Sequence, residues 1–120
     1  MKAGPAHRAR LHREIETIVE QLKAMGGRKI LLFGSLARGE ISLFSDIDLL
    51  VLFDEDRPAA ELTRSVYQLP QRSEAVDVLA YSLRSWERIK DRPFFRHILS
   101  YAKVLYEEPE TGSGPLAAAG

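Results

Sequence analysis

The stretch Leu32-Phe-Gly-Ser-Leu-Ala-Arg-Gly-Glu-Ile-Ser-Leu-Phe-Ser-Asp-Ile-Asp-Leu-Leu-Val51 joins a glycine turn to a pair of acidic residues. Gly34-Ser35 ends an apolar run, ten residues follow, and Asp46-Ile-Asp48 then opens a second apolar run. A glycine turn brings backbone N–H groups and a hydroxyl close to phosphate oxygens, and two carboxylates on one strand face can hold a divalent cation. The stretch therefore predicts a site for a phosphate-bearing ligand and its metal ion.

The pattern of apolar and turn-forming residues around this stretch predicts alternating helices and strands. An apolar stripe of helical spacing predicts a helix over residues 6–25, which Gly26-Gly27 ends. The next elements expected are a strand at 29–33, a helical turn at 35–38, a loop at 40–45 and a strand at 46–53. A helix that begins at Pro58 and is closed by Pro70 follows, and then a strand at 75–81. The last elements expected are a helix capped by Ser82, a helix beginning at Pro93 and a strand at 103–106. Because such helices need a sheet face to cover, we expect an α/β (α+β) fold with a small mixed sheet.

Length and composition limit what the chain can be. With 120 residues it is expected to form one domain over residues 1–107, followed by a disordered tail at 108–120 that is rich in small residues and proline. The sequence has no cysteine, so a metal site must use oxygen or imidazole ligands, and a cytoplasmic location is expected.

The charge balance argues against two classes of partner. The 17 basic residues equal the 17 acidic ones, so we expect no direct binding of nucleic acid and none of an anionic membrane. No apolar run reaches the ~20 residues of a membrane span, and no signal peptide is expected at the N-terminus.

Asp46 and Asp48 are two residues apart on a predicted strand, so their side chains share a face, with Cα atoms roughly 6.5 to 7 Å apart. Their neighbours are apolar, and two unpaired charges beside a core repel each other and are costly to desolvate. A divalent ion such as Mg²⁺ removes both problems. The alternative is that both acids simply face solvent.

Asp77 is a third acid, set alone in the apolar run Ala75-Val-Asp-Val-Leu79. If the second and third strands are neighbours, ~4.8 Å apart, Asp77 stands beside the pair and completes a three-carboxylate cluster that can hold two metal ions or activate a hydroxyl. Otherwise it is a salt-bridged or edge-exposed residue.

Several other side chains are candidates for the site. Arg38 can either neutralise phosphate charge or pair with Glu40, and Ser45 fits a turn better than a ligand. Core packing is the better interpretation of the aromatic residues Trp86, Phe94 and Phe95. No metal spacing is present among the histidines His7, His12 and His97.

Gly34-Ser35, the ten-residue interval and Asp46-x-Asp48 together resemble the signature of the DNA polymerase β-like nucleotidyltransferase superfamily. Ala37-Arg-Gly39 and Ser45-Asp-Ile-Asp-Leu49 are similar to its minimal nucleotidyltransferase branch, and the likeness runs over about residues 10–107. The superfamily's third acid falls on Asp77, and Lys103-Val-Leu-Tyr-Glu107 resembles the closing strand of the branch.

The resemblance implies transfer of AMP from ATP to an acceptor hydroxyl with two Mg²⁺ ions. In that scheme Asp46, Asp48 and Asp77 would be catalytic metal ligands, and Gly34 and Ser35, with Arg38, would bind the phosphates. Small members of the branch resemble antitoxins of toxin–antitoxin pairs whose partner is a HEPN-domain ribonuclease, and some adenylylate a tyrosine of that partner.

Three functions follow from this resemblance. The first is an adenylyltransferase acting on a HEPN-domain protein from a neighbouring gene. The second is a non-catalytic antitoxin that neutralises its partner by contact, although clustered acids give a pure binder no advantage. The third is a small-molecule nucleotidyltransferase, which at this length would need a homo-oligomer or a partner to close its pocket.

Overall fold

A computed structural model of the chain describes residues 4–40, 46–69 and 76–109. The helices are α1 (Pro5–Ala24), α2 (Gly34–Ala37), α3 (Ala59–Tyr67), α4 (Leu83–Ile89) and α5 (Pro93–Leu99). The strands are β1 (Gly27–Phe33), β2 (Ile47–Phe53), β3 (Val76–Ser82) and β4 (Lys103–Glu107). The order of helices and strands predicted from the pattern is confirmed.

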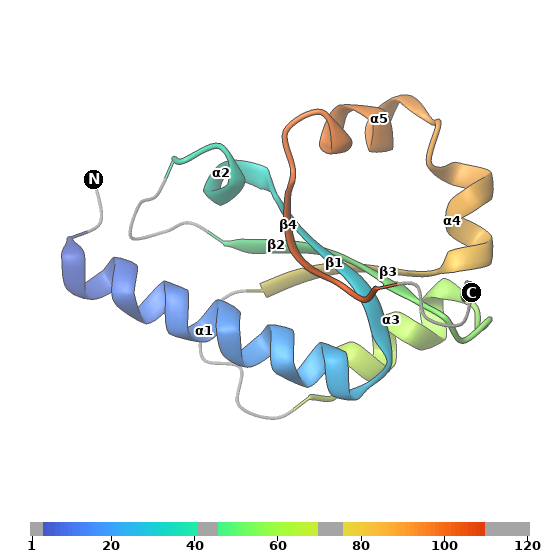
Figure 1. The fold of residues 1–120 in the computed structure, drawn as a ribbon, viewed down its shortest axis with the longest axis horizontal. Helices are drawn as coiled ribbons and strands as arrows, with labels where there is room; N and C mark the ends of the chain where they lie inside the picture. Colours follow the sequence, from blue (N-terminus) through green and yellow to red (C-terminus); the bar gives the residue numbers. More distant parts are fainter. Residues whose placement is uncertain (1–3, 41–45, 70–75, 110–120) are drawn as a thin grey trace.

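The strands form one mixed sheet in the order β3-β2-β1-β4 (Figure 1). β1 pairs antiparallel with both β2 and β4, whereas β2 pairs parallel with β3. The parallel pair is joined by α3, as parallel strands require a crossover connection. The predicted small mixed sheet is therefore present, with β2 in its interior.

Helices cover both faces of the sheet (Figure 1). On β2, Leu49 and Val51 belong to the core that includes residues of α1 and α3, while Leu50 and Leu52 belong to the core that includes residues of α4 and α5. Burial on both faces explains why β2 is an almost continuous apolar run. A polar residue on this strand therefore needs a particular reason to be there.

Element boundaries differ from the predicted ones at a few positions. β1 begins at Gly27 rather than at residue 29. Its first position has no room for a side chain, because a Cβ added at Gly27 would lie 2.8 Å from the backbone oxygen of Leu22. Pro58 is the residue before α3 and has extended ψ, so it is the cap and not the first helical residue. Residues 41–45 of the predicted loop, Pro70, Ala75 and most of the predicted tail lie outside the described residues.

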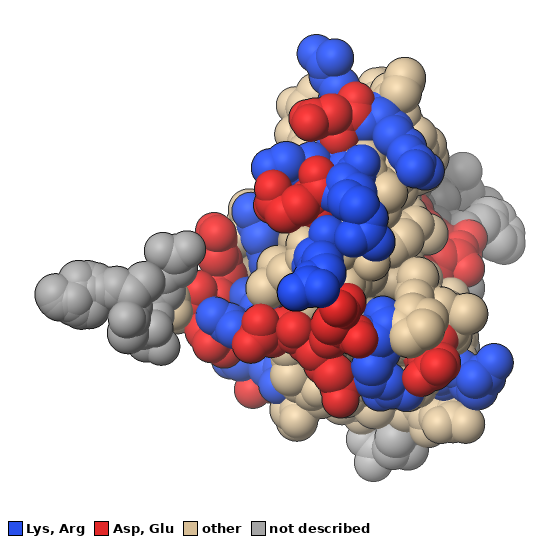
Figure 2. Space-filling view, turned by 90° about the vertical axis from the view of Figure 1, so that its right-hand side faces the viewer, with Lys and Arg blue, Asp and Glu red and all other residues tan. Residues whose placement is uncertain are grey.

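The surface carries charges of both signs. Figure 2 shows lysine and arginine side chains interleaved with aspartate and glutamate over one face of the molecule. Some of the surface charges form ion pairs, for example Arg57–Glu61 and Lys90–Glu87. None of the described helices is both long and apolar enough to cross a membrane.

Candidate functional site

The three acidic residues of the predicted site lie at one end of the β2–β3 pair. Asp48 is the direct register partner of Asp77 across the parallel ladder, and Asp46 comes two residues before Asp48. Because Leu50 on β2 faces α4 and α5 while Val78 on β3 faces the opposite core, alternation places Asp48 and Asp77 on the α4–α5 face. The expectation that the two strands are neighbours is confirmed.

The negative charges of these carboxylates repel one another. Burial raises the pKa of the Asp48 carboxyl, and the nearby carboxylates of Asp77 and Asp46 raise this pKa further. Asp48 is half-buried, whereas Asp46 and Asp77 are exposed. A bound divalent cation would relieve this repulsion, so the donor set fits a hard metal ion.

The three carboxylates do not form a closed cage. Within residues 4–40, 46–69 and 76–109, no group of three His, Asp or Glu side chains is gathered closely enough to hold a metal ion. Mg²⁺ usually keeps water and substrate phosphates among its ligands and takes only one or two carboxylates. One or two of these carboxylates would therefore be enough to hold such an ion.

Gly34 brings the glycine turn into contact with the Asp48 carboxylate. Its φ is +76°, a conformation that side chains rarely adopt, and a Cβ built on it would lie 2.9 Å from Asp48 Cγ and would clash with Oδ2. The contact follows from the sheet register, because Phe33, directly before Gly34, is paired with Asp48. The two halves of the sequence motif thus meet at one point.

The residues after Gly34 form a tight turn. In α2, the Ser35 carbonyl accepts hydrogen bonds from the backbone N–H groups of Arg38 and Glu40, at 3.1 and 2.9 Å. Gly39 then ends the turn with φ +81°. Ser35 is half-buried and Arg38 is exposed, so both lie where a ligand at the turn could be reached.

Tyr101 is a residue of the site that sequence reasoning missed. It lies between α5 and β4, and its hydroxyl oxygen accepts a hydrogen bond of 3.1 Å from the backbone N–H of Gly34. The Arg38 guanidinium carbon lies 4.6 Å from the centre of the Tyr101 ring. His97 contacts the same ring edge-to-face, with centroids 5.4 Å apart.

One aromatic expectation is wrong. Trp86 and Phe95 are buried in the core between the sheet and α4–α5, as predicted, but Phe94 is 57% exposed. The short helix α5 directs Phe95 and Ile98 inward, and a residue one position from Phe95 is rotated about 100° away from that direction. Phe94 contacts the Phe95 ring edge-to-face, with centroids 5.1 Å apart.

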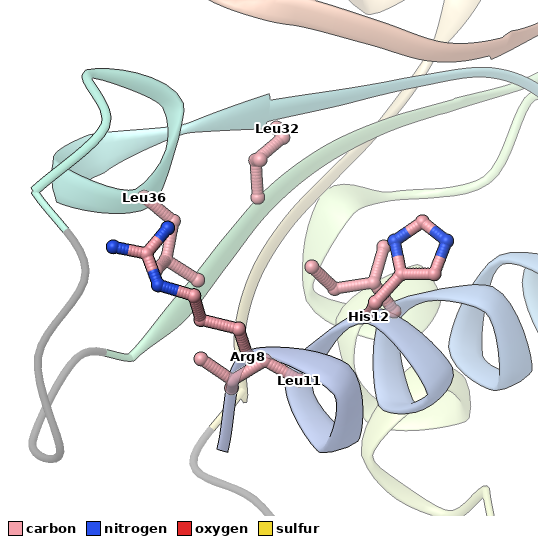
Figure 3. Close-up of a pocket in the computed structure, with 6 residues that line it drawn as sticks. Arg8, Leu11, His12, Leu32 and Leu36 are labelled. Carbon is pink, nitrogen blue, oxygen red and sulfur yellow. The ribbon is translucent and has the colours of Figure 1, made fainter. Parts of the chain in front are cut away.

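A small cavity lies on the other face of the sheet. Figure 3 shows Arg8, Leu11 and His12 of α1 opposite Leu32 and Leu36. The cavity that these residues line has a volume of about 150 Å³. Leu32 and Leu36 belong to the core that faces α1, whereas the carboxylates lie on the α4–α5 face. The cavity is therefore not the metal site.

Comparison with known proteins gives consistent results. The profile of the family described as "Nucleotidyltransferase domain" matches residues 12–106. A protein of Methanocaldococcus jannaschii named "Putative protein adenylyltransferase" is 39% identical over 66 residues, which cover 54% of this chain and 71% of that protein.

Solved structures resemble this fold as well. A crystal structure of a "putative nucleotidyltransferase" from Sulfolobus solfataricus has a TM-score of 0.61 and 20% identity, covering 88% of this chain and 90% of that one. A structure of the toxin–antitoxin pair MntA-HpeT has a TM-score of 0.48 and 21% identity, covering 77% and 71%. The first of these supports the assignment of the fold.

Proposed function

The chain belongs to the family of nucleotidyltransferase domains, and from that premise we propose that it transfers AMP from ATP to a hydroxyl group of a protein. The observation that carries the proposal is the contact between Gly34 and Asp48. This contact supports the proposal, because the turn that we assign to the phosphates lies directly beside the Asp48 carboxylate, a ligand type that suits the metal ion of a nucleoside triphosphate.

Each residue has a distinct part in the proposed reaction. Asp46, Asp48 and Asp77 would hold Mg²⁺, which when bound neutralises phosphate charge and makes the α-phosphorus more electrophilic. Gly34 and Ser35 would bind the β- and γ-phosphates together with Arg38. These assignments agree with the exposure of Arg38 and the half-burial of Ser35.

The chemical step is a substitution at phosphorus. The acceptor oxygen forms a bond to the α-phosphorus, the bond from that phosphorus to the bridging oxygen of the β-phosphate breaks, and pyrophosphate leaves. The acceptor's proton passes to the carboxylate of Asp77 as the new bond forms. Asp77 is exposed on the edge strand β3, so an acceptor attached to another protein can approach it.

We propose a tyrosine of a HEPN-domain protein from a neighbouring gene as the acceptor. The motif around Ala37-Arg-Gly39 and Asp46 supports this, because it resembles the minimal branch in which such pairs occur. The name of the Methanocaldococcus jannaschii relative supports a protein acceptor in general. The chain would then act as the antitoxin by modifying its partner.

The test is to incubate the chain with ATP, Mg²⁺ and the purified neighbouring HEPN-domain protein and to measure the partner's intact mass. We expect one adenylate on the partner, and none with Asp46→Asn or Asp48→Asn. Asp54→Asn is the matched control, because Asp54 follows the other end of β2 and its ion pair with Arg28 is at the surface.

The same experiment separates the proposal from its main alternative. An unmodified partner that still forms a tight complex with the chain would contradict the proposal and indicate neutralisation by contact. Modification that persists at full rate in Asp48→Asn would contradict the assigned site.

A further inference from the structure

We propose that Tyr101 is part of the triphosphate-binding surface and makes the site prefer a nucleoside triphosphate over a monophosphate. The inference rests on the proposed function and adds a residue that the sequence motif does not contain. It comes from the contacts that Tyr101 makes with Gly34 and Arg38, on opposite ends of the four-residue helix α2.

The hydroxyl of Tyr101 is oriented by the glycine turn. The Gly34 N–H donates to its oxygen at 3.1 Å. A phenolic hydroxyl can also donate one hydrogen bond, and among the described residues no acceptor for this proton is found. Because the Gly34 N–H already fixes the position of the hydroxyl oxygen, the hydroxyl can donate its proton to a phosphate oxygen beside the turn without a change of side-chain conformation.

The ring of Tyr101 positions the positive charge of the site. Arg38 is exposed, and a free arginine on a surface loses considerable rotamer entropy when it binds a ligand. Its guanidinium carbon lies 4.6 Å from the centre of the Tyr101 ring, which is within the range of a cation–π interaction. The ring therefore holds Arg38 near the turn, where it can bind a phosphate in a bidentate manner.

His97 supports the ring from α5. Its imidazole contacts the Tyr101 ring edge-to-face, with centroids 5.4 Å apart. Tyr101 is thus fixed by a backbone donor and by two side-chain contacts. This degree of fixation fits a residue that forms a wall of a binding site, because a rigid group pays less entropy when the ligand arrives.

These contacts predict selectivity among nucleotides. The turn at Gly34 is the part of the site that we assign to the β- and γ-phosphates, and AMP has neither. The hydroxyl of Tyr101 should therefore contribute to the binding of ATP and not to the binding of AMP.

The test is isothermal titration calorimetry with Mg²⁺ and an ATP analogue that has a methylene bridge between the α- and β-phosphorus atoms, so that no transfer takes place. Tyr101→Phe keeps the ring and removes the hydroxyl. We expect it to weaken binding of the analogue about tenfold, which corresponds to ~1.4 kcal/mol for a hydrogen bond to a charged group, and to leave AMP binding unchanged. Tyr101→Leu also removes the ring and should weaken binding further.

Tyr106→Phe is the matched control. Tyr106 also has a cation over its ring, Lys23 Nζ at 4.5 Å from the centroid, but it belongs to β4 and is paired with Ile30, away from the glycine turn. We expect it to bind the analogue and AMP as the unmodified protein does. The unfolding temperatures of all three variants report whether the fold is intact.

The remaining outcomes overturn one claim or both. Binding of the analogue that is unchanged or tighter in Tyr101→Phe would overturn the role of Tyr101 while the proposed function stands. An equal loss of AMP and analogue binding would show a merely structural role for the hydroxyl. If the unmodified protein binds no nucleotide with Mg²⁺, the proposed function fails, and the role of Tyr101 fails with it.

Discussion

Gly34 is the single residue on which both halves of the site depend. It needs a positive φ, and it leaves the space that the Asp48 carboxylate occupies. We expect Gly34→Ala to destabilise the protein by about 2–4 kcal/mol, because backbone strain and a steric clash add. Urea unfolding measures this loss.

Gly39→Ala provides the comparison for Gly34. Gly39 has a similar φ of +81°, but a Cβ there would meet nothing within 4 Å. Its replacement should cost only about 1–2 kcal/mol, the strain of the backbone conformation alone. Equal losses for the two variants would show that the contact between Gly34 and Asp48 has no energetic importance.

Asp48 is predicted to destabilise the metal-free protein. Burial and the carboxylates of Asp77 and Asp46 raise its pKa in the folded state above the unfolded value of about 3.9. A carboxyl with a raised pKa in the folded state contributes full stability in acid, and that stability is lost as the pH rises from the unfolded to the folded pKa. With a chelator present, Asp48→Asn should therefore be the more stable protein at neutral pH.

The difference should stay within about 1 kcal/mol, because solvent still reaches the half-buried carboxyl and screens its interactions. It should disappear at a pH below the unfolded pKa. Urea unfolding of both proteins across a pH series gives the answer. An Asp48→Asn variant that is less stable at neutral pH would indicate a stabilising partner for this carboxylate.

The site residues differ in how far the sequence predicts them. The positions of Asp46, Asp48 and Gly34 in the fold are predictable, because spacing along the chain determines which strand face a residue occupies and where a turn follows. Tyr101 left no such signal, since its bond to Gly34 joins positions 67 residues apart. A contact of this kind depends on where α5 ends over the sheet, which no local pattern encodes.

At the scale of secondary-structure elements, one side chain fixes the junction between β3 and α4. Ser82 is 1% exposed, its hydroxyl oxygen accepts a hydrogen bond of 3.0 Å from the Ser85 N–H, and its hydroxyl donates to Asp56 Oδ1 at 3.3 Å. We expect Ser82→Ala to cost about 1–2 kcal/mol, because a helix cap is lost and a buried polar partner is removed.

Chemical denaturation of Ser82→Ala and of the control Ser85→Ala tests this cap. Ser85→Ala keeps the backbone N–H that the cap binds and loses only a hydroxyl that accepts a bond from exposed Arg88, so it should change stability by no more than about 0.5 kcal/mol. A neutral Ser82→Ala variant would contradict the assigned role of the cap.

Helices are predictable where an apolar stripe of helical spacing runs over several turns, or where a residue type that favours the N-cap precedes the helix. The α1 stripe and the Ser82 cap are examples, and both are confirmed. Phe94 is exposed and not part of the predicted core, because α5 has only seven residues and a shift of one position exchanges an inward for an outward direction. The boundary at Pro58 was off by one residue for a similar reason, since a proline suits both the cap and the first turn.

At the scale of the whole molecule, the sheet order β3-β2-β1-β4 brings the site together. The parallel pairing of β2 with β3 supplies Asp77, and the antiparallel pairing of β1 with β2 supplies the glycine turn. Helix and strand patterns predicted that a mixed sheet would form. The same patterns do not predict that β1 pairs with β4, because the periodicity of a strand indicates which face each side chain occupies and not which strand lies beside it.

The proposed reaction transfers the nucleotide and not the terminal phosphate. The most direct measurement compares two samples of ATP, labelled either at the α- or at the γ-phosphorus, incubated with the chain, Mg²⁺ and the neighbouring HEPN-domain protein. We expect the partner to acquire the α-label, the γ-label to appear among the products only in pyrophosphate, and Asp48→Asn to abolish the transfer. Transfer of the γ-label to the partner, or no transfer of either label, would contradict the proposed reaction.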